Sequence, residues 1–229
     1  MNNVRLISYT EAISDSYVKE MNVEGLIAYC ARVSNPSNQN NEATAHKLIK
    51  YLIKHKHWSP LEMVNVCLEI ETTRDIGRQI LRHRSFSFQE FSQRYAKAQG
   101  FDQIRPRRQD TKNRQNSIDD IEDGLVDWFR EAAQEVEDLA NYYYETSLSL
   151  GIAKESARFL LPLNTKTRMY MNGTMRSWIH YIKLRTDPST QKEHRDIAEA
   201  IKIIFKKFKF FKILFRIFRV FICFLINFL

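Results

Sequence analysis

The sequence predicts an α+β fold built as one domain. Segments with helical periodicity and segments with strand-like alternation follow one another along the chain, and no internal repeat is present. A length of 229 residues is enough for one hydrophobic core and gives no reason to expect a second domain. Apolar residues make up 44% of the chain and charged residues 27%, as in soluble globular proteins. We place this domain at residues 1–205.

The first predicted elements lie before the middle of the chain. Residues 42–56 carry apolar side chains at helical spacing, and Pro60 lies shortly beyond them, so a helix is predicted there. Residues 63–71 alternate between apolar and polar side chains, which predicts a strand with one buried face. A threonine at the start of residues 72–82 can cap a further helix, whose isoleucines lie four positions apart.

The second half begins with a polar segment without periodicity, residues 97–116, which we expect to be a surface excursion. Ser117 and Asp120 resemble a capping box and predict the start of the longest helix, with Gly151 as its stop. We expect the tyrosines of this helix to serve packing and interfaces. The elements beyond it are expected to be a short helix at residues 153–161, a strand at 167–172, a helix at 174–184 and a last helix over 187–204.

The formal net charge of +8 is concentrated at one end of the chain. Seven lysine and arginine residues follow Glu199, the last acidic residue, and without them 28 basic residues face 27 acidic ones. A nearly neutral body argues against an extended nucleic-acid surface, so we expect no nucleic-acid partner.

Residues 206–229 form an anomalous basic and hydrophobic tail, composed almost wholly of Phe, Lys, Ile, Leu, Arg and Val. Arg216 and Arg219 interrupt its apolar run, so a membrane-spanning helix is not expected. Two interpretations stay open: a frameshift or run-on translation of A/T-rich sequence, which we prefer, or a basic helix on a membrane surface. We expect no membrane partner unless the tail belongs to the working protein.

The three cysteines are far apart and form no Cys-x-x-Cys pair, so neither a disulfide framework nor a zinc site is predicted. The N-terminus lacks a basic start followed by an apolar run, and we therefore expect no secretory signal and a cytoplasmic location. His55 and His57 could begin a metal site, but no third ligand follows at a recognisable spacing, and no metal is predicted. His46 and His194 are expected on helix surfaces.

The stretch RHRSFSFQEFSQRY (residues 82–95) holds the main chemical signal. On the helix before it, Arg74, Arg78 and Arg82 recur every four residues and can share one face. Such a face is often only solvated, but the serines, glutamate and further arginines that follow favour anion recognition, because guanidinium groups grip phosphate through paired hydrogen bonds. A competing hypothesis is a basic single-stranded RNA-binding module in which aromatic rings stack on bases. We favour packing over stacking for these rings, which are Phe86, Phe88 and Phe91.

The motif in this stretch resembles the hallmark of the flavin-dependent thymidylate synthases. That hallmark is Arg-His-Arg, seven residues and Ser, matched here by Arg82-His83-Arg84, SFSFQEF and Ser92. Three other segments resemble family blocks in the right order: HWSPLE (57–62), ARFLLPLN (157–164) and MRSWIHYIKLR (175–185). The resemblance covers about residues 1–205 and ends where the tail begins.

The resemblance implies reductive methylation of dUMP to dTMP, with methylenetetrahydrofolate as the carbon donor and FAD, reduced by NADPH, as the hydride donor. It also implies the family's fold, a central antiparallel or mixed sheet flanked by helices, assembled as a homotetramer with active sites between subunits. No Gly-x-Gly-x-x-Gly or P-loop is present, so FAD would not be held by a Rossmann fingerprint.

Site residues are assigned from the resemblance, position by position. The residues assigned to FAD are Ser59, Arg82, His83, Arg84, Glu90, Thr174, Arg176 and His180. The residues assigned to dUMP are Gln79, Arg82, Glu90, Ser92, Gln93, Arg94, Arg158 and Arg185. His57 and Glu62 would border the flavin site. Thr174 departs from the family's Asn-x-Arg pattern, since it keeps an oxygen but lacks an amide donor.

Arg185 is the residue to which the resemblance gives the catalytic role. Uracil C5 must become nucleophilic and C6 must accept hydride, and drawing negative charge towards the N3–O4 edge favours both. Arg185 stays protonated and would polarise that edge. Cys30 and Cys67 show no activating neighbour, so the thiolate attack used by flavin-free thymidylate synthases is not expected. Ser92 has no identifiable activating base and is assigned to substrate binding.

Overall fold

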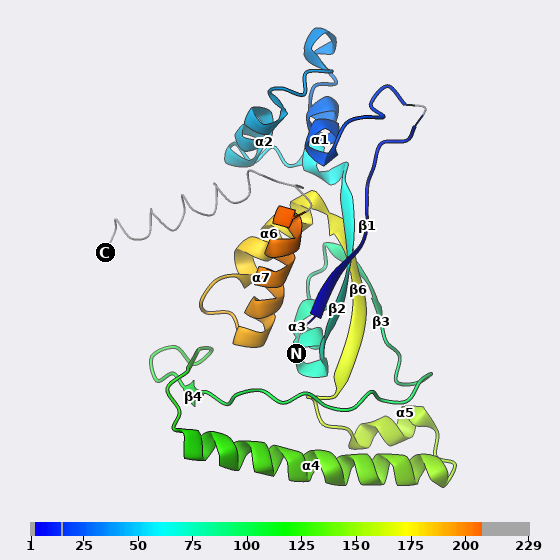
Figure 1. The fold of residues 1–229 in the computed structure, drawn as a ribbon, viewed down its shortest axis with the longest axis vertical. Helices are drawn as coiled ribbons and strands as arrows, with labels where there is room; N and C mark the ends of the chain where they lie inside the picture. Colours follow the sequence, from blue (N-terminus) through cyan, green and yellow to red (C-terminus); the bar gives the residue numbers. More distant parts are fainter. Residues whose placement is uncertain (1–2, 15, 208–229) are drawn as a thin grey trace.

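The computed structural model describes residues 3–14 and 16–207, so the expectations for the tail beyond residue 207 lie outside the described residues. A four-stranded antiparallel sheet forms the centre of the molecule (Figure 1). The predicted α+β fold with a central antiparallel sheet is confirmed. In spatial order the strands are β1 (Asn3–Tyr9), β2 (Asn65–Thr73), β6 (Lys166–Thr174) and β3 (Phe86–Glu90).

The two central strands, β2 and β6, pair along their whole length, from Asn65 opposite Thr174 to Thr73 opposite Lys166. Alternate side chains of both strands point into the core, as the alternating sequence pattern predicts. The side chains at 0% exposure are Val66, Leu68, Ile70, Met169 and Met171. The strands predicted at residues 63–71 and 167–172 are therefore confirmed, with ends that shift by one or two residues.

Seven α-helices surround this sheet in the described part of the chain. They are α1 (Val23–Ala31), α2 (Ala45–Lys54), α3 (Arg74–Ile80), α4 (Asp123–Ser149), α5 (Lys154–Ala157), α6 (Met175–Arg185) and α7 (Lys192–Lys207). The same part also contains the 3-10 helices η1 (Pro36–Asn38), η2 (Ser59–Glu62) and η3 (Arg158–Leu160), and a hairpin of β4 (Arg108–Gln109) and β5 (Ser117–Ile118). No helix within residues 3–14 and 16–207 has the length and apolar character needed to cross a membrane.

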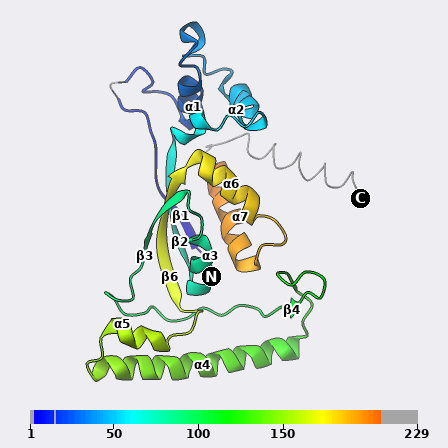
Figure 2. The same ribbon diagram turned by 180° about the vertical axis from the view of Figure 1, so that it is seen from behind.

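The helices divide into three groups around the sheet. Helices α3, α6 and α7 lie together on one side of it, whereas α1 and α2 lie at one end and α4 and α5 at the other (Figures 1 and 2). Because α3 follows β2 directly and α6 follows β6 directly, the antiparallel pairing starts these two helices at opposite ends of the sheet. The candidate site residues lie on and between these elements.

An aromatic cluster joins α6 and α7 to the sheet. Trp178 donates from Nε1 to the carbonyl of Val66 at 3.0 Å, and its ring lies 4.6 Å from that of Phe86. A Cβ atom at position 173 would lie 2.3 Å from the Phe86 ring, so Gly173 leaves the space that this ring fills. Phe86 and Phe88 thus pack against the core as predicted, which removes two of the rings that base stacking on RNA would require.

The start of the longest helix was wrongly predicted. Ser117 lies in β5 and pairs with β4, and α4 begins only at Asp123, with Glu122 as its N-cap. The predicted stop is confirmed, because Gly151 adopts φ of +82°, a left-handed conformation that favours glycine. The last helix begins at Lys192 rather than directly after Pro188, since the segment between them forms a turn.

Four strands and one α-helix were not predicted, namely β1, β3, β4, β5 and α1. The expectation for one of the two helix histidines was also wrong. His46 is exposed as expected, but His194 is 0% exposed because α7 turns it towards α3 and α6.

Candidate functional site

The Arg-His-Arg motif lies in the turn between α3 and β3 and meets the C-terminal end of α6. Arg185 donates from Nε to Nε2 of His83 at 2.9 Å, across 102 positions of sequence. The His83 ring also packs edge-on against Tyr181, with ring centroids 4.8 Å apart. The structure therefore brings together two of the residues that the sequence assigned to one active site.

The surroundings of His83 keep its ring neutral. Burial, followed by the nearby charges of Arg185 and Arg82, lowers the pKa of His83 to about 4. A neutral imidazole that accepts at Nε2 carries its hydrogen on Nδ1. Burial also lowers the pKa of Arg185, but a guanidinium stays protonated at neutral pH. Its terminal nitrogens make no hydrogen bond to any described residue and are available to a ligand.

Gln79 and His194 extend this contact into a larger group. Gln79, near the C-terminal end of α3, lies with Oε1 at 3.4 Å from Nδ1 of His194, and Nε2 of His194 lies 3.0 Å from the Tyr181 hydroxyl. We call Gln79, His83, Tyr181, Arg185 and His194 the α6 cluster. It combines residues assigned to dUMP and to FAD with two residues that the sequence did not single out as site residues.

The residues assigned around the flavin meet at the other end of α6. The segment η2 contains Ser59 and Glu62 and packs against α6, where the Arg176 guanidinium contacts the Glu62 carboxylate. The rings of Trp58 and His180 are in tilted contact, with centroids 4.4 Å apart. Burial, followed by the charges of Arg176 and Lys183, lowers the pKa of His180. His57, just before η2, is exposed.

Thr174 has a structural role at the start of α6. As the N-cap, it accepts the backbone N–H of Ser177 on Oγ1 at 3.3 Å. The Ser177 hydroxyl in turn donates to the carbonyl of Ser85 at 3.1 Å, which ties the start of α6 to the turn that carries Arg84. The substitution of threonine for the family's asparagine therefore keeps the helix cap.

A second group of assigned residues lies around the start of α3. The Arg74 guanidinium contacts Oε1 of Gln93. It also interacts electrostatically with Glu90 and Arg158. Burial lowers the pKa of Arg74, Glu90 raises it, and Arg78 and Arg158 lower it further. We call Arg74, Glu90, Gln93 and Arg158 the arginine cluster.

One amide in the arginine cluster is incompletely satisfied. Gln93 is only 2% exposed, and its Nε2 has no hydrogen-bond partner among the described residues. A buried N–H2 group without a partner costs free energy, so this position favours an added acceptor. Beside it, Arg94 pairs with Glu155 at 3.1 Å, and Arg158 donates to the backbone carbonyl of the same residue at 3.3 Å.

The two clusters lie towards opposite ends of α3. Arg74 begins this helix, whereas Gln79 and Arg82 lie at or just beyond its end. A rise of 1.5 Å per residue separates them by about 8–12 Å along the helix axis. Ser92, Arg94, Arg82 and Arg84 are all exposed. A single chain therefore does not gather the assigned dUMP residues into one closed pocket.

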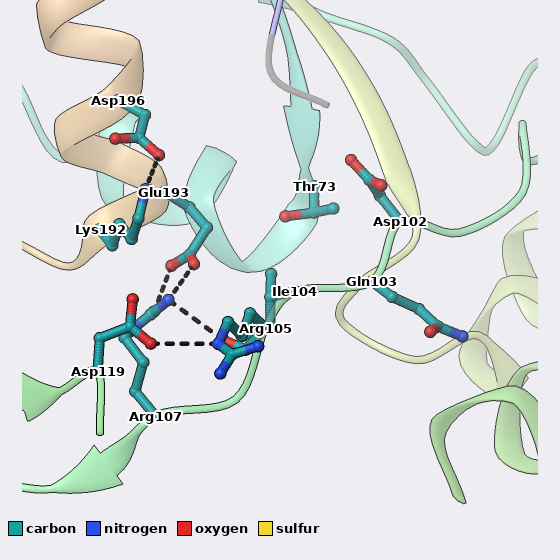
Figure 3. A pocket seen from close by; sticks show the side chains of 10 residues that line it. All are labelled: Thr73, Asp102, Gln103, Ile104, Arg105, Arg107, Asp119, Lys192, Glu193 and Asp196. Atoms are coloured by element: carbon teal, nitrogen blue, oxygen red, sulfur yellow. Dashed lines mark hydrogen bonds and ion pairs between the residues drawn. The ribbon is translucent and has the colours of Figure 1, made fainter. Parts of the chain in front are cut away.

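A cavity of about 390 Å³ lies elsewhere, between the start of α7 and the segment before α4 (Figure 3). It contains none of the assigned residues. Arg107 forms a two-pronged pair with Glu193 at 2.7 and 2.8 Å, and Arg105 pairs with Asp119 at 3.3 Å. Since the charges that line this cavity pair with one another, we do not regard it as the substrate site.

Among the described residues we find neither a metal site nor an activated cysteine. Within the described ranges, no three His, Cys, Asp or Glu side chains converge in a group that could hold a metal ion. Burial raises the pKa of the Cys30 and Cys67 thiols, which disfavours the reactive thiolate.

Three residues of these clusters received no role from the sequence: Arg74, Tyr181 and His194. The four-residue spacing of Arg74 with Arg78 and Arg82 was a visible signal for the first. No pattern marks Tyr181 and His194, because their contact arises only when α6 packs on α7.

The chain is similar to known proteins over most of its length. The family described as "Thymidylate synthase complementing protein" matches residues 16–208. The chain is 53% identical over 207 residues to the "Flavin-dependent thymidylate synthase" of Synechocystis sp., covering 90% of this chain and 94% of that protein. It is 50% identical, with the same coverage, to the "Probable flavin-dependent thymidylate synthase" of Paramecium bursaria Chlorella virus 1.

The fold is also similar to a solved structure, a UMP/dUMP methylase, PolB, from Streptomyces cacaoi bound with 5-Br dUMP. That likeness has a TM-score of 0.77, a sequence identity of 24% and a coverage of 91% of each chain, and it supports the fold. The family match and the extent of the sequence identity show that this chain belongs to the flavin-dependent thymidylate synthase family.

Proposed function

We propose that the chain catalyses the reductive methylation of dUMP to dTMP, with methylenetetrahydrofolate as the carbon donor and NADPH-reduced FAD as the hydride donor. The contact between Arg185 and His83 carries this proposal, because it joins the Arg-His-Arg hallmark to the end of the last family block. The names of the relatives and the dUMP analogue in the similar structure support the choice of substrate.

The arginine cluster is suited to bind the phosphate of dUMP. Arg158 and Arg94 both lie at Glu155 and offer guanidinium groups for paired hydrogen bonds to phosphate oxygens. Ser92 adds an exposed hydroxyl close by in sequence, and the buried Nε2 of Gln93 offers a donor that has no partner among the described residues. We assign these four residues and Glu90 to holding the nucleotide.

The α6 cluster is suited to activate the uracil ring. Nε of Arg185 is held by His83, which fixes the guanidinium plane and leaves the two terminal nitrogens for the N3–O4 edge. A fixed positive charge in a partly buried setting stabilises negative charge on that edge more strongly than it would in water. Gln79 and Arg82, beside this contact, would hold the same nucleotide.

The residues present also fit FAD. Arg82 and Arg84 present exposed guanidinium groups for a pyrophosphate, and the neutral ring of His83 can lie against an aromatic system. Ser59, Glu90, Thr174, Arg176 and His180 complete the set that we assign to the cofactor, with His57 and Glu62 at its border. When bound, the reduced flavin would supply the hydride, while these residues bind and orient it.

We further propose a homotetramer in which active sites form between subunits. One face of α4 leaves apolar side chains exposed at helical spacing, among them Trp128, Val136, Leu139 and Tyr142, and Phe159 beyond it is 90% exposed. Exposed apolar surface of this extent marks an interaction site. A second copy of the chain that covers this face would also bring new residues close to the exposed arginines.

A cytoplasmic location is part of the proposal and is supported by the free thiols of Cys30 and Cys67.

Tritium release from C5-labelled dUMP tests this function. The purified chain should be yellow, and it should release tritium only when both NADPH and methylenetetrahydrofolate are present. A colourless protein that binds no added FAD, or an FAD-loaded protein that releases no tritium with both co-substrates present, would contradict the proposal.

A further inference from the structure

His194 links three helices from a fully buried position. Its ring lies between Tyr181 of α6 and Gln79 of α3, with Nε2 at 3.0 Å from the Tyr181 hydroxyl and Nδ1 at 3.4 Å from Oε1 of Gln79. It is 0% exposed, and Tyr181 is 1% exposed. The contact to Tyr181 is fully buried and the contact to the half-buried Gln79 is partly buried, so a mismatched donor or acceptor at either contact would be costly.

The chemistry of the partners fixes that direction. Burial, followed by Arg185 and His83, lowers the pKa of His194 to about 3, so the ring is neutral and has a single N–H. The amide oxygen of Gln79 can only accept, which places the N–H of His194 on Nδ1. Nε2 is then an acceptor, and the hydroxyl of Tyr181, whose pKa is raised by burial, must donate to it.

The amide nitrogen of Gln79 is also held by a hydrogen bond of fixed direction. Its Nε2 donates to Oε1 of Gln191 at 2.7 Å, and Gln191 donates from Nε2 to the Glu193 carboxylate at 3.1 Å. Arg107 holds that carboxylate through two hydrogen bonds, visible as dashed lines in Figure 3. All hydrogen bonds from Tyr181 to Glu193 thus run in one direction and end on a paired negative charge.

This series of hydrogen bonds leaves the Gln79 amide with only one satisfactory orientation. A half-turn of the amide would place its N–H2 against the N–H of His194 and its oxygen against the oxygen of Gln191, giving two repulsive contacts. In the observed orientation, the second N–H on Nε2 has no partner among the described residues. Gln79 therefore offers a donor, and not an acceptor, to whatever binds beside it.

We propose that His194 is a positioning residue that holds the Gln79 amide so that its N–H donates to an acceptor atom of the bound nucleotide. This inference rests on the proposed role of Gln79 in holding dUMP. The sequence predicted that His194 lies on a helix surface. Instead it is buried beside the Gln79 amide, which we assign to dUMP, and this position suggests a role beyond packing.

Two substitutions of His194 test the contacts of its two ring nitrogens independently. The amide nitrogen of asparagine falls close to the place of Nδ1, so His194→Asn can still donate to Gln79 but cannot reach Tyr181. The amide of glutamine falls close to the place of Nε2, so His194→Gln keeps the contact to Tyr181 and loses the one to Gln79. Both variants lose the ring, which makes them matched controls for packing.

Equilibrium binding of dUMP to the FAD-loaded full-length protein is the primary readout. His194→Gln should raise the Kd and the KM for dUMP about five- to tenfold, the cost of one hydrogen bond, with kcat much less changed. His194→Asn should stay within about twofold of the wild type. Equal weakening in the two variants, measured with similar melting temperatures, would overturn the proposal and leave packing as the role of the ring.

A double-mutant cycle with Gln79→Leu gives the second readout. In that background His194→Gln should change the Kd by less than about twofold, because the group that it positions is gone. Additive effects would contradict the proposal. If either His194 variant fails to fold, Tyr181→Phe, which keeps the ring and removes the donor, should weaken dUMP binding about two- to threefold, and only when Gln79 is present.

The controls keep this inference distinct from the function on which it rests. If the wild-type protein binds no dUMP, the proposed function fails. If the wild-type protein binds dUMP and Gln79→Leu binds it equally well, the function stands and the positioning role of His194 is wrong.

Discussion

The α6 cluster and the arginine cluster differ in how far one chain completes them. In the α6 cluster, His83, Tyr181 and His194 find hydrogen-bond partners within the chain, and the contacts span three helices that pack on one another. In the arginine cluster, Nε2 of Gln93 has no partner among the described residues, and the side chain of the adjacent Arg94 is 66% exposed.

The difference follows from where each cluster lies in the fold. Helices α3, α6 and α7 enclose the α6 cluster on the covered side of the sheet, so its geometry is set when the core folds. The arginine cluster lies where α3 begins and where the segment after β3 meets α5 and η3. We therefore expect the first cluster to be preorganised and the second to be completed by substrate and by another subunit.

Removal of the fixed charge in the α6 cluster should have the largest effect. Arg185→Ala should lower kcat for tritium release by about 10²–10³-fold, as for loss of one preorganised charge-stabilising donor. Lys183→Ala, an exposed position on the same helix, is the matched control and should leave kcat unchanged. A variant of Arg185 with near wild-type kcat would show that the charge is not needed in the transition state.

Loss of a phosphate-binding group in the arginine cluster should act on affinity instead. Arg158→Ala should raise the KM for dUMP about 10–100-fold, the cost of a hydrogen bond between charged groups, with little change in kcat at saturation. Arg168→Ala, in strand β6, removes a charge paired only loosely with Glu69 at 4.0 Å and serves as the control. A selective fall in kcat would instead move Arg158 into the chemical step.

The packing behind the α6 cluster can be disturbed without touching its polar groups. Gly173→Ala should destabilise the protein by about 1–3 kcal/mol, because the new Cβ would lie 2.3 Å from the ring of Phe86. Gly124→Ala, where no atom lies within 4 Å, is the control and should be nearly neutral. Urea unfolding measures both, and equal stability in the two variants would contradict the packing that we describe.

The neutral histidines predict a pH dependence of stability. The pKa values of His83 and His194 are lowered to about 4 and about 3, so both rings stay neutral in the folded protein at pH 5. In the unfolded chain they titrate near pH 6.5. The unfolded state then binds more protons, and the free energy of unfolding should fall as the pH drops from about 6.5 to 4.

Urea titrations at pH 7.5, 6 and 5 measure that dependence. His194→Asn should show a weaker dependence than the wild type, by about one proton taken up on unfolding. The same slope in both proteins would show that His194 is not held neutral by the fold.

The sequence predicted the centre of the fold because its elements bury one regular face. The alternation in β2 and β6 and the periodicity of α2 and α6 reflect packing on one side, which side-chain type alone reveals. The edge strand β1 was missed because its alternation is broken where the register shifts between Leu6 and Ser8, and β3 was missed because its alternation covers only five residues inside the charged motif. Their pairing comes from the neighbouring strand.

The candidate site was predictable where a motif carries it. The Arg-His-Arg hallmark located the turn after α3, and the later block located Arg185, although 102 positions separate His83 from that residue. His194 could not be found in this way, because charged neighbours on both sides give α7 a polar pattern there. Its burial depends on contacts with α3 and α6 that only the folded chain provides.

Subunit complementation tests most directly whether two differently completed clusters build one active site. Arg185→Ala and Arg158→Ala chains, co-expressed with different tags, would be purified as mixed oligomers and assayed at a dUMP concentration near the wild-type KM. If one site takes Arg185 from one chain and Arg158 from another, about a quarter of the sites should regain both arginines, and activity should rise well above that of either parent. Mixed oligomers no more active than the average of the two parents would contradict the account.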